Sequence, residues 1–209
     1  MLKDIPIPLI NTFISAGAII IGTLIGAYCS WIITKKGTKL NLIHQKKLLY
    51  ENINYDKEYQ KKRLREYANI VRLDICTAIY ESMRIIKAAE EGEAFKPVLL
   101  PVNERYSTVI AALSSKYQLE ELSYIYQLYA LIETINYTIK DNGSEDYSNR
   151  VLEAYKGFLF KLYNENLHNI FKVKIDDISY KALYDNPNAD EKYRKILLKL
   201  DKLCKNKME

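Results

Sequence analysis

The chain has few of the residues that commonly build catalytic or metal sites. It contains only two histidines (His44 and His168) and three cysteines (Cys29, Cys76 and Cys204) in 209 residues. The cysteines lie far apart, without metal-ligand spacing or a disulfide pattern, which is typical of a protein in a reducing compartment. His168 follows Glu165 in a Glu-x-x-His pair, but a di-iron helical bundle needs two such pairs. These absences argue against a metal centre.

Glycine is also scarce, with seven residues, and none of them forms a GxxxxGK or GxGxxG loop that would hold a phosphate group. A nucleophile elbow and a zinc motif are absent as well. Acidic residues are plentiful, but a helix surface always offers them, so none can be assigned as an acid/base pair without a cleft. We therefore expect no enzymatic activity and no cofactor.

Charge is missing altogether from residues 5–34. A helix needs roughly 20 apolar residues to cross the hydrocarbon core of a bilayer, so we predict a transmembrane helix at residues 9–34. Pro6 and Pro8 should keep the preceding tail, residues 1–8, out of this helix. A cleaved signal peptide would have a basic start and an apolar core of only about 7–15 residues. The sequence therefore favours an anchor that is retained.

The segment after the predicted anchor is strongly basic. Residues 35–66 carry ten Lys and Arg against four Asp and Glu, whereas the tail carries only Lys3 and Asp4. Because Lys and Arg near a spanning helix stay on the cytoplasmic side, we predict a single-pass protein of the inner (plasma) membrane, with its N-terminus outside and its C-terminal domain in the cytoplasm. The side chains expected to contact lipid headgroups are Trp31, Lys35, Lys36 and Lys39.

Small residues recur every fourth position in the anchor, at Ala18, Gly22, Gly26 and Ser30. On a helix this spacing forms a flat strip, which lets a second helix approach closely enough for packing to hold the pair. We therefore predict that the anchor self-associates and that the protein is a homo-oligomer.

The remaining chain has helical periodicity throughout and no alternating stretch typical of a strand. We predict an all-α protein: a basic juxtamembrane segment and long amphipathic helix at 35–91, either continuous or broken near 54–56, followed by a helical bundle at 92–209 that packs on it. Gly92 is expected to end the long helix in a left-handed conformation. Abundant tyrosines at helical spacing are expected to be core and core-edge rings. The bundle's helices are predicted at about 103–115, 117–140, 144–171, 176–184 and 188–205.

These features favour a membrane-anchored scaffold or adaptor that acts through protein–protein contact with a cytosolic partner. The first alternative is a membrane-active effector, such as a holin-like, toxin or phage-exclusion protein, because a strip of small residues also suits an assembly that perturbs the bilayer. The second is a helical enzyme whose site is not visible in the sequence. Nucleic acid is not expected as a partner: residues 61–65 (KKRLR) and the last helix are basic, but the domain beyond residue 66 is nearly neutral.

Overall fold

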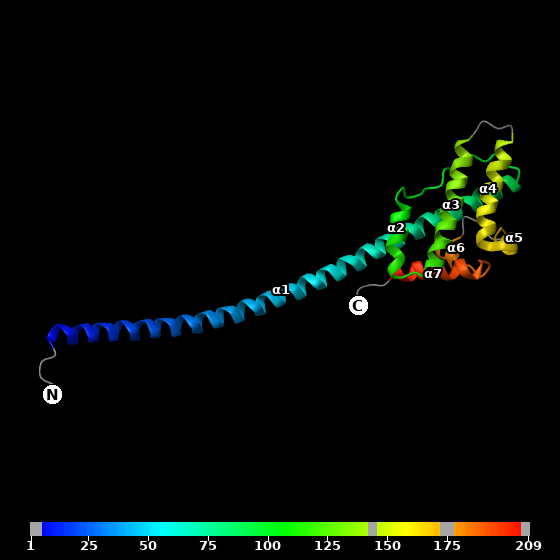
Figure 1. Ribbon diagram of the computed structural model, residues 1–209. Helices are drawn as coiled ribbons and strands as arrows, with labels where there is room; N and C mark the ends of the chain where they lie inside the picture. Colours follow the sequence, from blue (N-terminus) through cyan, green and yellow to red (C-terminus); the bar gives the residue numbers. More distant parts are fainter. Residues whose placement is uncertain (1–5, 142–145, 172–177, 206–209) are drawn as a thin grey trace. The chain divides into compact units, whose positions relative to one another are not determined.

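The computed structural model describes residues 6–141, 146–171 and 178–205. These residues form helices and connecting segments without a strand, which confirms the predicted all-α fold class. The chain divides into two compact units, residues 1–59 and 60–209. The long N-terminal helix α1 (Ile7–Glu90) contributes residues to both units (Figure 1).

In the first unit, α1 begins at Ile7, so the prediction that the prolines delay the helix to Leu9 is wrong. Pro8 lies in the first turn, where a missing N–H costs the helix no hydrogen bond. Of the two alternatives for residues 54–56, the structure shows the continuous helix. Asn and Asp lower helix propensity by less than about 1 kcal/mol each, and neither blocks the helix as proline would.

In the second unit, the last part of α1 is a core helix. Its buried side chains cover somewhat more than half of the helix circumference, and between residues 68 and 89 only Leu73 and Arg84 are exposed. A helix that is apolar on most sides is surrounded by other elements, which explains why its sequence shows only a partly regular apolar stripe. Its buried apolar residues are Ala68, Val71, Ile75, Cys76, Ala78, Ile79, Met83, Ile85 and Ile86.

The end of α1 is as the sequence predicts. Gly92 has a φ of +75°, in the left-handed region that favours glycine. The amide of Gly92 donates to the carbonyl of Ala89 (3.2 Å) and that of Glu93 to the carbonyl of Ala88 (2.9 Å). These two bonds form the motif that satisfies the last carbonyls of a helix before the chain turns away.

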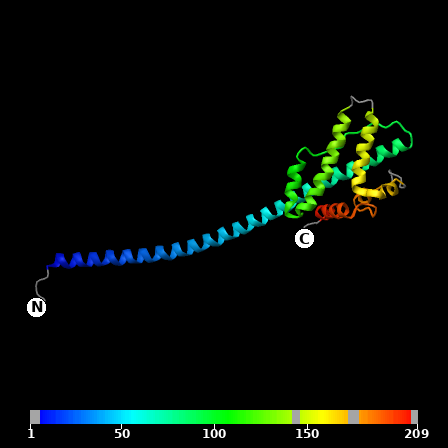
Figure 2. The ribbon, with the colours of Figure 1, turned by 45° about the vertical axis from the view of Figure 1, so that its right-hand side comes forward.

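Shorter helices complete the core around this part of α1. α3 and α4 pack along each other (Figure 2), α2 lies against α3, and α7 contacts α3 and α6. The helices are α2 (Tyr106–Ala112), the 3-10 turn η1 (Leu113–Ser115), α3 (Leu119–Lys140), α4 (Tyr147–Tyr163), the 3-10 turn η2 (Asn164–Asn166), α5 (Leu167–Ile170), α6 (Tyr180–Tyr184) and α7 (Glu191–Lys205).

Two predicted boundaries differ from the structure, and two fall outside the described residues. Helix α2 begins at Tyr106, because Asn103 instead makes a turn in which its Oδ1 accepts from the amide of Arg105 (2.8 Å). The helix predicted at 144–171 is interrupted at Asn164, whose φ is +49°. There the amide of Asp190 satisfies the carbonyl of Leu162 (2.7 Å), which ends α4. The predicted starts at 144 and 176 lie outside the described residues.

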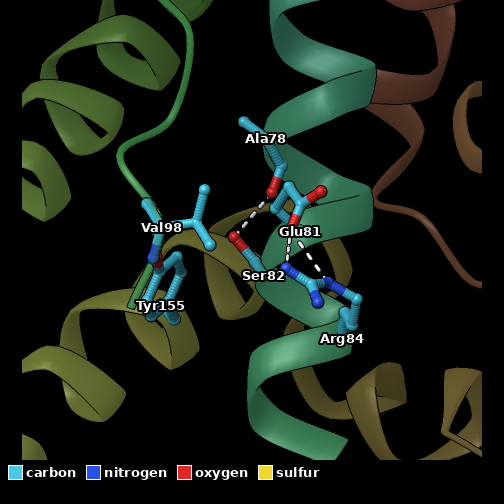
Figure 3. Close-up of polar contacts among 6 residues, drawn as sticks. All are labelled: Ala78, Glu81, Ser82, Arg84, Val98 and Tyr155. Atoms are coloured by element: carbon cyan, nitrogen blue, oxygen red, sulfur yellow. Dashed lines mark hydrogen bonds and ion pairs between the residues drawn. The ribbon is translucent and has the colours of Figure 1, made fainter. Parts of the chain in front are cut away.

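Side chains from α3 and α4 hold the segment that joins α1 to α2, residues 93–105, which we call the connecting segment. The Tyr155 hydroxyl of α4 donates to the carbonyl of Val98 (2.7 Å) and accepts from its amide (3.3 Å), and Figure 3 shows the two residues together. Asn136 of α3 bonds both backbone groups of Leu100, at 2.7 and 2.8 Å. These side chains supply the partners that a neighbouring strand would otherwise provide.

Candidate functional site

The first candidate site is the apolar part of α1. This helix contains a window long and apolar enough to cross a membrane, and no part of the window is buried by the rest of the chain. Large apolar side chains along it, such as Phe13, Ile21 and Ile25, are more than half exposed. Two of its hydroxyls bond within the helix: Thr12 donates to the carbonyl of Pro8 (2.9 Å) and Thr23 to that of Ile20 (2.8 Å). Such internal bonds suit a helix in hydrocarbon, where water is absent.

The predicted strip of small residues lies on this window, and Ala18, Gly22, Gly26 and Ser30 are all exposed. A Cβ added to Gly22 or Gly26 would meet no other atom within 4 Å. The glycines are therefore not required by packing or by backbone conformation within this chain. What they provide is a surface that another helix could approach closely.

Aromatic and basic side chains meet at the end of the apolar window. The Tyr28 and Trp31 rings lie 6.1 Å apart, and the Lys35 ammonium lies 4.9 Å from the centre of the Trp31 ring. Lys36 and Lys39 are exposed on the turns that follow. An indole ring with an ammonium over its face is the combination expected at the headgroup level of a bilayer.

In the second unit, Asp74 is a nearly buried carboxylate, 8% exposed. Its Oδ2 accepts from the hydroxyl of Tyr129 (2.9 Å) and from the amide of Asn103 (3.1 Å). The Tyr129 ring is in turn stacked on Tyr106, with centroids 4.5 Å apart. Burial raises the pKa of Asp74 above its ordinary value, and the two hydrogen bonds offset part of that effect. This group joins α1, α3 and the connecting segment.

Asp201 of α7 is the second buried acid, 6% exposed. Its oxygens accept from Arg72 of α1 (2.6 Å), from the Tyr184 hydroxyl (2.9 Å) and from Lys205 (2.5 Å). Burial acts to raise the pKa of Asp201, but these hydrogen bonds outweigh it and hold the pKa below its ordinary value. Both acids therefore tie separate elements of the domain together. Sequence reasoning missed this role because most of their partners, such as Tyr129 and Arg72, are distant in sequence.

Neither the cysteines nor the histidines build a site in the described part of the chain. Within it, no three His, Cys, Asp or Glu side chains are grouped closely enough to hold a metal ion. Burial raises the pKa of the Cys76 thiol to about 12, which makes it unreactive. Glu165 and His168 lie in different elements, η2 and α5, and the His168 Nδ1 contacts the backbone carbonyl of Glu165 (2.9 Å), not its carboxylate.

The described residues of the second unit line surface clefts that include three with volumes of about 490, 390 and 260 Å³. The largest of these three, which we call the basic cleft, is lined by α1, α2 and the turn that follows α2. The second lies beside α6 and includes Arg72 and Lys181, and the third includes Asp185. Neither Asp74 nor Asp201 lines any of the three. The polar residues of the basic cleft are Gln60, Lys61, Arg63, Tyr67, Thr108, Ser115 and Lys116.

Comparison of the chain with models of known protein families, with curated proteins and with solved structures finds no match.

Proposed function

We propose that this protein is a membrane-anchored scaffold that self-associates through its anchor and presents its helical domain to a protein partner in the cytoplasm. The observation that carries the proposal is the apolar window of α1, which the rest of the chain leaves uncovered. At about 25 cal/mol per Å² of apolar surface, leaving such a window in water would be very unfavourable. Lipid, together with other copies of the helix, would remove it from water.

The charge distribution supports the orientation that we propose, with the N-terminus outside and the helical domain in the cytoplasm. Basic residues follow the window at Lys35, Lys36 and Lys39, and only Lys3 precedes it. Retention of basic residues on the cytoplasmic side favours this arrangement.

The buried acids support a binding role over catalysis. Catalytic acids and bases typically have perturbed pKa values and face a cleft. Asp74 and Asp201 have shifted pKa values, but each is enclosed by hydrogen bonds between helices and lies away from the three clefts. The pKa of Asp74 is raised by burial, and that of Asp201 is lowered by its hydrogen bonds, so neither shift requires a catalytic role.

Self-association is tested by replacing Gly22 and Gly26 with isoleucine in a membrane reporter of helix pairing. Both substitutions should weaken the signal, because the larger side chains hold the helices apart. Gly17→Ile is a matched control: Gly17 also has no atom within 4 Å of an added Cβ, and nine residues, about two and a half turns, place it opposite Gly26. An unchanged signal in the Gly22 and Gly26 variants would refute the packing strip.

Orientation is tested with Cys204 as the single cysteine, in a full-length variant carrying Cys29→Ala and Cys76→Ala. Cys204 is partly exposed in α7, so a membrane-impermeant maleimide can reach it once it has access to that side of the membrane. Labelling only after permeabilisation is the expected result. Labelling in intact cells would reverse the proposed orientation.

Membrane depolarisation on expression distinguishes the scaffold from the membrane-active alternative. A scaffold should leave the membrane potential unchanged, whereas an assembly that perturbs the bilayer should collapse it. If depolarisation occurs and is abolished by Gly22→Ile with Gly26→Ile, the strip belongs to a membrane-active assembly and the scaffold proposal is wrong.

A further inference from the structure

One side of α1 carries no charge over the turns that follow the apolar window. Six positions on this side succeed one another at spacings of three, four, three, four and three residues, and all six are exposed. At 3.6 residues per turn they fall within an arc of about 100° around the helix axis. We call them the uncharged face: Thr38, Asn41, Gln45, Leu48, Asn52 and Tyr55.

The lysines of the same turns lie on the opposite side of the helix, within an arc of about 120°. They are Lys35, Lys36, Lys39, Lys46 and Lys47. Glu51 lies at the edge of the uncharged face and is directed to Lys47 at 3.9 Å. Asp56, one residue past the end of that face, is the first charged residue within its arc. Two parallel copies that met on the lysine side would bring like charges together, so charge favours the uncharged face as the side on which a second copy approaches.

The uncharged face continues the strip of small residues in the anchor. Two steps of four residues lead from Ser30 through Thr34 to Thr38, and α1 runs through all three without interruption. Copies held in one membrane with the same orientation are parallel, so a pair formed at the strip starts the two uncharged faces side by side. Tethering of this kind raises the effective concentration of one face at the other. This step rests on the self-association of the anchor proposed above.

The spacing of three and four residues is that of a coiled-coil seam. In such a seam Leu48 and Tyr55 occupy d positions, and their side chains, 59% and 71% exposed in the single chain, would be shielded from water. Gln45 and Asn52 occupy a positions. An amide side chain both donates and accepts hydrogen bonds, so Asn52 can bond to Asn52 of a second copy when the two helices are in register.

The neighbouring track of α1 contains more aliphatic residues but is interrupted by charge. It carries Leu42, Leu49 and Ile53, and the seam positions between them are taken by Lys39 and Lys46. In a parallel pair each of these lysines would face its equivalent, which is unfavourable at both positions. This track therefore suits a second copy less well than the uncharged face does.

We propose that the uncharged face pairs with the same face of a second copy, as a parallel, in-register helix pair that extends the contact between anchors beyond the membrane. The seam is too polar to hold an untethered helix tightly, and the anchors supply the proximity that it needs. In this pair the lysines point outward, where Lys35, Lys36 and Lys39 remain available to lipid headgroups.

The test is disulfide cross-linking between copies of the full-length chain in membranes. The parent variant carries Cys29→Ala and Cys204→Ala and keeps the buried Cys76. One new cysteine at a time is introduced and oxidised with copper phenanthroline, and the cross-linked dimer is quantified on a non-reducing gel. The parent variant itself is the blank.

Four positions are compared. Ser30→Cys reports on the anchor, and Leu48→Cys and Asn52→Cys report on the uncharged face. Asn54→Cys is the matched control, because it replaces the same residue type two positions from Asn52, on the opposite side of the helix. Cysteines whose Cα atoms are more than about 7 Å apart cannot be bridged without backbone movement. The first three variants should therefore form dimer several-fold faster than Asn54→Cys.

The other outcomes separate this inference from the proposed function. Cross-linking of Ser30→Cys alone would show that the anchors pair and the helices then diverge, as a crossing angle of about 40° would make them do; this overturns the inference and leaves the self-association of the anchor in place. Cross-linking of Asn54→Cys or Lys46→Cys as fast as that of Asn52→Cys also overturns it. Dimer from Leu48→Cys and Asn52→Cys without dimer from Ser30→Cys supports the uncharged face and contradicts the packing strip. Absence of dimer at every position contradicts both.

Discussion

We predict that Asp74→Asn hardly changes the free energy of unfolding, whereas Asp74→Ala lowers it. Its Oδ2 accepts both the Tyr129 hydroxyl and the Asn103 amide, so an asparagine oxygen in the same position keeps both bonds. Alanine leaves two buried donors without an acceptor, at about 1–3 kcal/mol each, while relieving part of the cost of burying a carboxylate. We expect Asp74→Ala to lower the free energy of unfolding by about 2–4 kcal/mol and Asp74→Asn to change it by less than about 1 kcal/mol.

The raised pKa of Asp74 makes the difference in stability between Asp74→Asn and the wild type depend on pH. In the unfolded chain the carboxyl ionises near its ordinary pKa of 3.8, whereas burial makes the folded protein hold the proton to higher pH. Between these two pKa values the folded state binds more protons, so the free energy of unfolding of the wild type falls as pH rises. Asparagine has no such proton. The stability of Asp74→Asn relative to the wild type should therefore increase through this window and then level off.

The measurement is urea unfolding of the full-length chain in detergent micelles, followed by the near-ultraviolet circular dichroism of the buried tyrosines, from about pH 4 to pH 7. Asp201, whose pKa is lowered, contributes the opposite slope, but it is present in both proteins and cancels in the difference. The reasoning fails if Asp74→Asn is as costly as Asp74→Ala. It also fails if the relative stability of Asp74→Asn declines with pH.

Two further predictions concern the core. Tyr155→Phe keeps the buried ring but removes the hydroxyl that bonds the connecting segment. It should lower the free energy of unfolding by about 1–3 kcal/mol and speed amide hydrogen exchange in that segment. Unchanged exchange would show that other contacts hold the segment. Cys76 is buried, and burial raises the pKa of its thiol to about 12. In the folded protein at neutral pH it should therefore resist a maleimide while the partly exposed Cys204 reacts, as mass spectrometry can measure; equal rates would contradict the packing of α1.

The features that could be predicted from the sequence are those that depend on neighbouring residues. The uncharged run at residues 5–34, the left-handed Gly92 and the amphipathic period of α7 each need only a short stretch of chain to be visible. The interruption at Asn164 could not be predicted in this way, because it depends on Asp190, whose amide satisfies the end of α4. The basic cleft could not be predicted from the sequence for a similar reason. The basic run at 61–65 is visible there, but only the fold brings Lys116 next to it.

Buried tyrosines hold parts of the backbone that lie between or at the ends of helices. Phenylalanine would fill the same volume, yet the hydroxyls of Tyr129, Tyr155 and Tyr163 bond to Asp74, to the Val98 backbone and to the carbonyl of Leu183 (3.2 Å). Each ring is thus buried among apolar side chains, while its hydroxyl forms a hydrogen bond with a polar group on another element. Hydroxyl bonds from the core therefore help to hold the connecting segment and the end of α6 in place.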